Sequence, residues 1–356
     1  MFTNKFIQES FDVHKEVSNW WQTWYSAVST LQNKDDVKVG HMETEEVASR
    51  DKLKLLRFKN DSNRKIKTPL LISYALVNRF TIADLQKDKS LVEKLAEAGI
   101  EVYVMDWGYP DPADRYLDLD DYINDYIDFS VNTICKLDNV DKVNLLGICQ
   151  GGVMALCYTA LHPEKIQNLI TMVTPVDFHS KNDRLSHMIQ KVDIKNFVDT
   201  FGNVSGELLN INFNMLNPVT SNIKKWIDAV NILSNEEKAD FFIRMEEWIN
   251  DSPDQAGCAY KQFIETFYQK NSFVKKNTYI NGSKIDLLKI TQPVLNIYGL
   301  KDHLVPPESS KALAKLIASK DYEELVVDTG HIGMYVSSQA KAVPEQIIEW
   351  LNEKSN

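Results

Sequence analysis

One stretch constrains the fold of this 356-residue chain more than any other, namely residues 143–152, which read VNLLGICQGG. An aliphatic run ends in a Gly-x-Cys-x-Gly pattern, which is typical of a nucleophile elbow with cysteine in place of serine. In such a sharp strand-to-helix turn, side chains at Gly147 and Gly151 would collide with neighbouring elements. The turn should project the Cys149 sulfur above a sheet, at the positive end of a helix that favours a thiolate. Taken alone, the pattern also fits an inert buried cysteine.

Strand and helix patterns alternate on both sides of this turn. Strands are predicted at 52–58 (an edge strand), 69–73, 101–105, 142–146, 168–173, 293–298 and 324–327, and helices at 88–98, 120–137, 151–161, 308–317 and 338–351. This alternation predicts an α/β fold with a mostly parallel, doubly wound sheet, helices on both faces and right-handed crossovers.

The alternation breaks in one long segment, which predicts an insertion. Residues 178–288 are helical in pattern and rich in aromatic side chains, so we expect a helical cap over the sheet. The predicted divisions are an N-terminal amphipathic aromatic helix and linker at 1–45, a core at 46–177, the cap at 178–288 and the rest of the core at 289–356.

The N-terminal helix predicted within residues 1–33 carries an aromatic stripe. Trp20, Trp21 and Trp24 fall with aliphatic residues at steps of three and four, which places them on one helix face. The stripe either packs on the protein's own core or docks a partner or an apolar surface.

Composition excludes several classes of protein. The first residues lack the apolar run of a signal peptide, and no stretch reaches the roughly 18 apolar residues of a membrane span, so we expect a cytoplasmic protein. A net charge of −10 argues against nonspecific binding of nucleic acid. The four cysteines have no metal-ligand spacing, which predicts free thiols and neither a metal site nor a disulfide framework.

Two further residues complete a catalytic pattern with Cys149. Asp302 and His331 each follow a predicted strand, so nucleophile, acid and histidine occur in the order of the α/β-hydrolase triad. The backbone N–H groups of Gln150 and Val77 are the predicted oxyanion hole. His303, beside Asp302, either tunes this acid as a second-layer residue or only holds its loop.

Cysteine at the elbow indicates the reaction. A thiol that attacks a thioester forms another thioester of similar free energy, so the acyl group stays activated and can pass to an alcohol. The triad therefore suits acyl transfer from a donor such as acyl-CoA, with His331 as the base that draws the proton from Cys149. An apolar cap would exclude the water that would hydrolyse the intermediate.

The chain also resembles a known family over most of its length. The similar segments are YALVNR at 74–79, SLV at 90–92, GIEVY at 99–103, DWGYP at 106–110, LDDYI at 119–123, GICQGG at 147–152, TPVDF at 174–178 and GHI at 330–332. These segments resemble the polyhydroxyalkanoate synthases, and the DWGYP form is most similar to the class III catalytic subunit.

The resemblance implies polymerisation of (R)-3-hydroxyacyl-CoA, chiefly 3-hydroxybutyryl-CoA, with release of CoA. Carried onto this sequence, it implies that Cys149 holds the growing chain as a thioester and that His331 activates it. Asp302 would orient His331 or help deprotonate the attacking hydroxyl, and the sequence leaves both roles open. Acyl-CoA is the substrate, so no cofactor is implied.

The resemblance also implies partners. It implies a second, non-catalytic subunit of the PhaE type and residence at the surface of the polymer granule, and it leaves homodimerisation open. Subunit docking is then the preferred use of the aromatic N-terminal helix. Candidate cations for the CoA phosphates are Arg79, Lys224, Lys225, Lys275 and Lys276.

Two rival functions remain at this point. A cysteine hydrolase of the same fold, thioesterase-like or dienelactone hydrolase-like, would use the same triad on water. A granule-associated protein without catalysis would use only its aromatic N-terminus and cap. The product discriminates among them, because a synthase yields polymer and CoA, a hydrolase yields free acid and CoA, and a structural protein yields neither.

Overall fold

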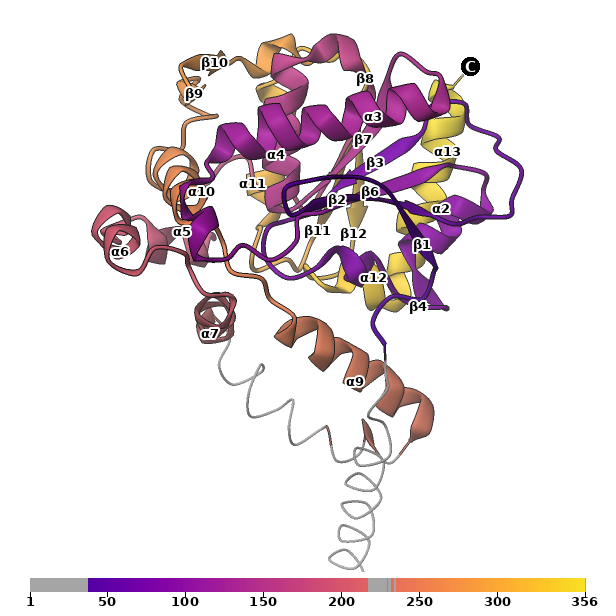
Figure 1. Cartoon of the computed structure of the whole chain (residues 1–356), viewed down its shortest axis with the longest axis horizontal. Helices are drawn as coiled ribbons and strands as arrows, with labels where there is room; N and C mark the ends of the chain where they lie inside the picture. The colour runs from indigo at the N-terminus through magenta and orange to yellow at the C-terminus, as the bar shows by residue number, and fades with distance from the viewer. Residues whose placement is uncertain (1–37, 217–228, 230–231, 234, 356) are drawn as a thin grey trace, which may run out of the picture. The chain divides into compact units, whose positions relative to one another are not determined.

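The computed structural model describes residues 38–216, 229, 232, 233 and 235–355 (Figure 1). The aromatic helix predicted within residues 1–33 lies outside the described residues and stays a prediction. The chain divides into two compact units, of which the larger comprises Gly40–Leu209 and Asp251–Asn356 and the smaller includes Asn210–Asn250. The predicted cap at 178–288 contributes residues to both units, and the domain boundaries given from the sequence stay predictions.

The main sheet of the larger unit is mostly parallel, as predicted. Among the described residues its eight strands lie in the order β1-β2-β6-β3-β7-β8-β11-β12. The β1–β2 and β2–β6 pairs are antiparallel, and the other neighbouring pairs of this sheet are parallel. The bounds are β1 Thr44–Arg50, β2 Leu53–Phe58, β3 Leu70–Ser73, β6 Val102–Asp106, β7 Val143–Ile148, β8 Ile166–Met172, β11 Val294–Gly299 and β12 Tyr322–Val327.

The edge of this sheet differs from the prediction. The strand predicted as an edge is β2, but β1 pairs with its outer side across a turn in which Asp51 has a φ of 52°. The sequence of β1, TEEVASR, is polar, and its residues are exposed or half-buried. A strand with both faces near solvent lacks the alternation of apolar and polar residues by which strands are identified in a sequence. The sequence of β1 therefore resembles that of a polar link.

Helices cover both faces of the sheet, as predicted (Figure 1). Helix α4 (Gln150–Leu161) packs on β7 beside α3 (Asp128–Asp138), and α2 (Leu91–Glu97) packs against α13 (Ala342–Lys354). The core between these layers and the sheet includes the fully buried Tyr103, Tyr158 and Trp350.

Four predicted helices are interrupted or shortened, and the one predicted at 338–351 begins as the 3-10 turn η9 (Ser338–Lys341) before α13. A π-helix, η3 (Asp121–Ile127), precedes α3, and α11 (Pro307–Lys311) continues into the 3-10 turn η8 (Ala312–Lys315). The helix predicted from residue 88 begins at Leu91, because the Ser90 side chain accepts a hydrogen bond from the Glu93 N–H as its N-cap. Residues 89–90 instead form β5 (Lys89–Ser90), which pairs with β4 (Asp84–Gln86).

The segment predicted as a cap is mainly helical where it is described. It contains α5 (Arg184–Ile189), α6 (Ile194–Phe201), α7 (Gly206–Leu216), α9 (Glu236–Asn250), α10 (Gly257–Phe263), the π-helix η6 (Ile264–Gln269) and a hairpin of β9 (Thr278–Ile280) and β10 (Ser283–Ile285). Within the described residues, no helix has the length and apolar content needed to cross a membrane.

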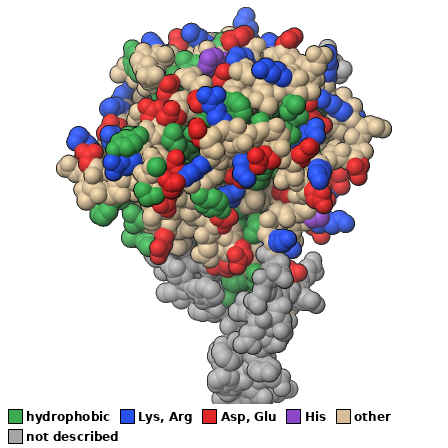
Figure 2. Space-filling view, viewed as in Figure 1, with side chains coloured by type: hydrophobic (Ala, Val, Ile, Leu, Met, Phe, Trp, Pro, Cys, Tyr) green, Lys and Arg blue, Asp and Glu red, His purple; other side chains and the backbone are tan. Residues whose placement is uncertain are grey.

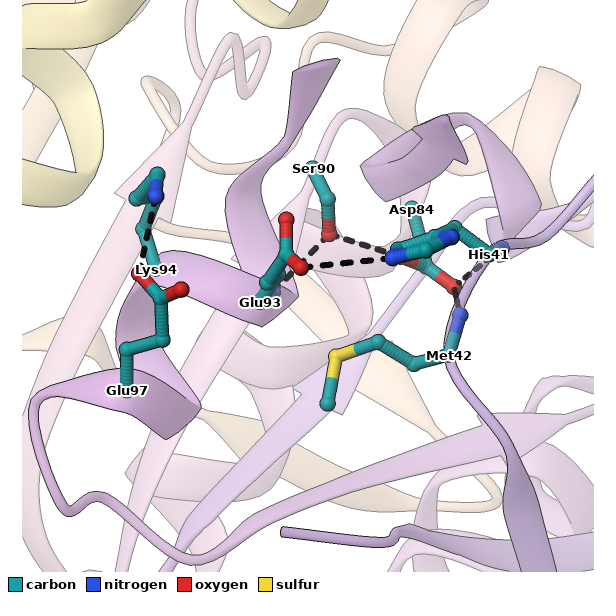
Figure 3. Close-up of polar contacts among 7 residues, drawn as sticks. All are labelled: His41, Met42, Asp84, Ser90, Glu93, Lys94 and Glu97. Carbon is teal, nitrogen blue, oxygen red and sulfur yellow. Dashed lines mark hydrogen bonds and ion pairs between the residues drawn. The ribbon is translucent and has the colours of Figure 1, made fainter. Parts of the chain in front are cut away.

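A buried carboxylate anchors the chain where it enters the larger unit (Figure 3). Asp84, which is 2% exposed, accepts hydrogen bonds from the His41 and Met42 N–H groups at 2.8 and 2.7 Å and from the Ser90 hydroxyl at 2.6 Å. One side chain therefore fixes the segment before β1 onto the start of α2.

We expect Asp84→Ala to destabilise the protein, since it leaves the Met42 N–H and the Ser90 hydroxyl without their buried acceptor, while the His41 N–H keeps only the Asp84 backbone carbonyl at 3.0 Å. The expected loss is about 2–4 kcal/mol of unfolding free energy in urea titrations. Glu97→Ala is the matched control. Glu97 forms an ion pair with Lys94 at 2.8 Å, but both side chains are exposed, so the pair contributes less than about 0.5 kcal/mol to the unfolding free energy. Equal effects of the two substitutions would contradict the anchoring role.

Candidate active site

The predicted nucleophile elbow is present between β7 and α4. Cys149 has φ 53° and ψ −122°, a left-handed conformation that a side chain adopts only under strain. Its N–H donates to the Met172 carbonyl at 2.9 Å, which holds the turn against β8. The half-buried thiol therefore lies at the N-terminal end of a twelve-residue helix, as the sequence predicted.

The glycines around Cys149 are required by close packing. A Cβ on Gly147 would lie 2.5 Å from the Gly152 Cα, and a Cβ on Gly151 would clash with the Ser73 carbonyl oxygen. The collisions predicted for Gly147 and Gly151 are therefore confirmed. Gly152 carries a further restriction that the sequence did not reveal, since a Cβ there would overlap the Thr174 side chain.

Asp302 and His331 meet at the carboxyl ends of neighbouring strands. Asp302 follows β11 and His331 follows β12, and the Asp302 Oδ2 and His331 Nδ1 atoms lie 2.7 Å apart. The Asp302 side chain is fully buried, and its Oδ1 accepts the N–H groups of Leu304 and Val305, each at 2.9 Å. Both carboxylate oxygens thus have partners, and the second imidazole nitrogen remains for Cys149.

His331 also hydrogen-bonds to Cys149, and its charge balance favours protonation. Burial of the imidazole disfavours its protonated form. The Asp302 carboxylate and the Cys149 sulfur favour the protonated imidazole, through their charges and through hydrogen bonds to the ring. Together they raise the pKa of His331 well above its usual value. An imidazole that readily takes a proton from a neighbouring thiol is suited to activate that thiol.

The predicted oxyanion-hole residues lie on the two segments expected for them. Gln150 is the first residue of α4, and its side-chain oxygen accepts the Leu76 N–H at 3.1 Å. This bond fixes the loop after β3, which carries Val77, beside the elbow. The use of the Gln150 and Val77 N–H groups as oxyanion donors stays a prediction.

The other candidates from the sequence are more distant from this chemistry. His303 is exposed, and the structure gives it no contact with the triad. All four cysteines are free thiols, as predicted, and burial raises the pKa of Cys157 well above its usual value. Lys275 and Lys276 are exposed, while Lys224 and Lys225 lie outside the described residues.

Arg79, the remaining candidate cation, already interacts with an acidic and an aromatic side chain of the larger unit. It pairs with Asp106 at 2.7 Å and lies over the Tyr109 ring at 4.5 Å. Arg79 and Asp106 border a pocket between the loops after β3 and β6 and the Pro253–Gln255 segment. Figure 2 shows acidic and basic side chains interspersed on the viewed face.

Sequence reasoning missed three tyrosines around Cys149. Tyr74 and Tyr335 are buried and hydrogen-bonded to each other, and their hydroxyls interact electrostatically with Cys149, as does the buried hydroxyl of Tyr268. Tyr74 directly follows β3, and Tyr335 comes four residues after His331. Their distance in sequence from a strand end and from a triad residue could therefore have indicated that both lie near the active site. Tyr268 had no such indication, because its approach to Cys149 depends on tertiary folding.

A second buried acid was also missed. Asp183 is 2% exposed, and burial raises its pKa to about 7, with further increases from the negative charges of Asp177 and Asp302. A hydrogen bond from the Ser186 N–H, at 2.8 Å, opposes this shift only in part. The folded protein therefore holds a proton on Asp183 at a pH where the unfolded chain does not.

This proton predicts a pH dependence of stability. Between the unfolded pKa, near 4, and about 7, the folded state binds more protons, so Asp183 lowers the unfolding free energy as pH rises. Asp183→Asn should gain stability over the wild type between pH 5 and 8, on the order of 2 kcal/mol in urea unfolding. Asp193→Asn, at the exposed cap of α6, should show no such trend. A pH-independent difference for Asp183→Asn would contradict the buried protonated acid.

Comparison with known proteins agrees with this architecture. Residues 68–338 match the model of the alpha/beta hydrolase fold family. Among solved structures, the monoacylglycerol lipase of Paleococcus ferrophilus is similar with a TM-score of 0.56 at 17% identity, covering 88% of this chain and all of that one. The monoglyceride lipase of Saccharomyces cerevisiae is similar with a TM-score of 0.54 at 13% identity, covering 90% and 97%. These likenesses concern the fold.

Curated relatives are much more similar in sequence. The poly(3-hydroxyalkanoate) polymerase subunit PhaC of Thiocystis violacea is 48% identical over 99% of this chain and 98% of its own length. The PhaC subunits of Allochromatium vinosum and Synechocystis are 47% and 42% identical, covering 99% and 95% of this chain and 98% and 92% of theirs. The chain thus belongs to the PhaC family of poly(3-hydroxyalkanoate) polymerases, acyltransferases built on the α/β-hydrolase fold.

Proposed function

We propose that this polymerase joins (R)-3-hydroxyacyl groups from CoA, chiefly 3-hydroxybutyryl-CoA, and that the growing chain is held as a thioester on Cys149. The observation that carries the proposal is the chain of contacts from Asp302 through His331 to Cys149 at the elbow. It gives the polymerase a thiol with an adjacent base, which is the requirement for acylation by a thioester.

The first half of the reaction follows from this arrangement. His331 takes the proton of Cys149, and the thiolate attacks the carbonyl carbon of acyl-CoA. Backbone N–H groups at Gln150 and Val77 would stabilise the oxyanion that forms. The bond to the CoA sulfur then breaks, and His331 returns the proton to the departing thiolate. The product is an acyl-enzyme whose thioester retains the activation of the substrate.

Asp302 acts in this proposal as the residue that orients His331. One of its oxygens accepts two backbone N–H groups and the other contacts His331 Nδ1, so a direct role toward the substrate hydroxyl would require one of these bonds to break. A fixed carboxylate that holds the imidazole tautomer and stabilises the imidazolium is sufficient for the triad.

The finer assignments of partners belong to the same proposal. A second subunit of the PhaE type would complete the class III enzyme, and the complex would work at the surface of the polymer granule. No cofactor enters the reaction, because acyl-CoA supplies the activated group.

The aromatic N-terminus is the segment proposed to dock the second subunit. Removing residues 1–30 should therefore abolish co-elution with the second subunit on a sizing column. Unchanged co-elution would show that this segment does not dock the subunit.

The product of the reaction tests the proposed function. The purified chain, with and without a second subunit, is given (R)-3-hydroxybutyryl-CoA while free thiol and insoluble material are measured. Thiol release that depends on Cys149 and deposits polyester supports the proposal. Cys149-dependent release that yields only soluble hydroxy acid would show a hydrolase instead.

A further inference from the structure

Gln255 lies in a closely packed neck of the larger unit, formed by residues 202–206 and 252–257. Val204 and Gln255 form an antiparallel bridge between these two segments, in which each N–H donates to the other residue's carbonyl at 2.9 Å. The segments also approach closely at Gly206, where a Cβ would lie 1.9 Å from a carbonyl oxygen of the opposite segment. The backbone of Gln255 is therefore held in place by the neck.

The Gln255 side chain contacts the residue that follows the nucleophile. Its Oε1 accepts a hydrogen bond from Gln150 Nε2 at 3.4 Å, and both residues are buried, with exposed fractions of 2% and 7%. The Oε1 of the same Gln150 carboxamide accepts the Leu76 N–H at 3.1 Å. One buried carboxamide thus connects the neck to the loop after β3, which carries Val77.

The chemistry of a carboxamide fixes the orientation of the Gln150 side chain. A carboxamide has one oxygen, which accepts hydrogen bonds, and one NH2 group, which donates them. The Leu76 N–H needs an acceptor, so the Gln150 oxygen faces the loop and its NH2 group faces the Gln255 oxygen. Loss of the Gln255 oxygen would leave this buried NH2 group without that acceptor, which favours rotation of the Gln150 side chain away from Leu76.

The position of this loop matters for the proposed reaction. The N–H groups of Val77 and Gln150 are the proposed oxyanion donors, and such donors act at about 2.7–3.1 Å from the oxygen that they stabilise. Packing fixes the start of the loop, since a Cβ on Gly151 would lie 2.4 Å from the Tyr74 carbonyl oxygen. The Gln150 side chain fixes the loop again two residues later, at Leu76. Because Leu76 is bonded to Val77, a shift of one N–H moves the other.

We propose that Gln255 is a positioning residue for the acylation of Cys149. It holds the Gln150 carboxamide against Leu76, and in this way it fixes the Val77 N–H at hydrogen-bond distance from the oxyanion. The inference rests on the proposed function. It adds to the residues of the elbow a side chain from the segment predicted as a cap.

Gln262 allows a positioning role to be separated from a structural one. It also belongs to the segment predicted as a cap, and its carboxamide also binds a backbone N–H of the core. Its Oε1 accepts the Leu119 N–H at 2.8 Å, and its Nε2 donates to Asp118 at 3.2 Å. These partners precede η3 and belong neither to the elbow nor to the loop after β3.

A double-mutant cycle tests the inference. The full chain is used, with the second subunit where CoA release requires it, in excess over (R)-3-hydroxybutyryl-CoA, so that CoA release reports a single acylation of Cys149. Gln255→Met and Gln150→Met keep the length of each side chain but remove its amide, and they are measured singly and together. Gln262→Met is the matched control. Urea unfolding reports the stability of each variant.

We expect Gln255→Met to lower the maximal rate of acylation about 10-fold, a smaller effect than the roughly 100-fold or greater loss on removal of an oxyanion donor itself. The concentration that gives half the maximal rate should change by less than about twofold, because the lost interaction acts on the transition state. Adding Gln255→Met to Gln150→Met should cost less than about twofold, since Gln255 acts through Gln150. Gln262→Met should acylate within about twofold of the wild type, even at a comparable loss of stability.

Three results would overturn the inference and leave the proposed function intact. Gln255→Met could acylate at the wild-type rate, its loss could multiply with that of Gln150→Met, or Gln262→Met could slow acylation equally. If Gln255→Met does not fold, Gln255→Asn takes its place in the cycle, because its shorter side chain withdraws the oxygen from Gln150. A wild type without Cys149-dependent CoA release would instead overturn the proposed function, and this inference with it.

Discussion

Cys149→Ala is expected to abolish CoA release and polymer formation, with a loss of at least about 10⁴-fold. The substitution removes the atom that forms the covalent intermediate, and loss of a triad nucleophile has an effect of this size in related chemistry. The measurement is thiol release from (R)-3-hydroxybutyryl-CoA together with recovery of insoluble polyester. The folded state should persist, because the half-buried thiol has little packing to lose.

Cys149→Ser sharpens this prediction. Serine keeps the elbow, the triad and the hydrogen bond to His331, but attack by an alcohol converts the thioester into an oxygen ester that is less activated. We expect acylation to survive at a low rate and elongation to fail. If Cys149→Ser made polymer at close to the wild-type rate, the argument for a thioester intermediate would be wrong.

Asp302→Asn is expected to lower steady CoA release by about 10³- to 10⁴-fold. The amide keeps the shape of the side chain but removes the negative charge beside His331 Nδ1, which fixes the imidazole and raises the pKa of His331. The rates of acylation of Cys149 and of chain elongation should both fall, since His331 is no longer held in position to act as the base in either step.

A nearby acid provides the control for this substitution. Asp328 is an exposed residue just after β12, where it pairs with Lys301 at 2.8 Å. Asp328→Asn should leave CoA release within about twofold of the wild type. If Asp302→Asn were equally mild, the contact between Asp302 and His331 would have no catalytic function.

Local sequence patterns predicted the parts of the site that follow strand ends. The glycines at 147 and 151 indicated a tight turn, and the structure shows the backbone atoms that forbid larger residues there. Asp302 and His331 could be paired in advance, because parallel strands end at one edge of the sheet. The expected α/β fold and mostly parallel sheet follow from the same alternation of elements.

Features that depend on long-range contacts could not be predicted. Strand β1 escaped notice because its residues are mostly polar and are exposed or half-buried, and among the described residues it pairs with β2 alone. Asp183 looks in sequence like an ordinary helix cap, and only the packing of its loop against the segment after Asp302 makes it a buried acid. Tyr268 shares a helical segment with other core aromatics, and no spacing separates it from them.

The central claim is that the growing chain is bound to Cys149, and mass spectrometry tests it most directly. The enzyme is mixed with a small excess of (R)-3-hydroxybutyryl-CoA, quenched in acid and digested with trypsin, which releases residues 143–165 as one peptide with both Cys149 and Cys157. The account predicts one or more 3-hydroxybutyryl units on Cys149, removable by hydroxylamine, and an unmodified Cys157. An acyl group on another residue, or polymer formed while Cys149 stays free throughout, would contradict it.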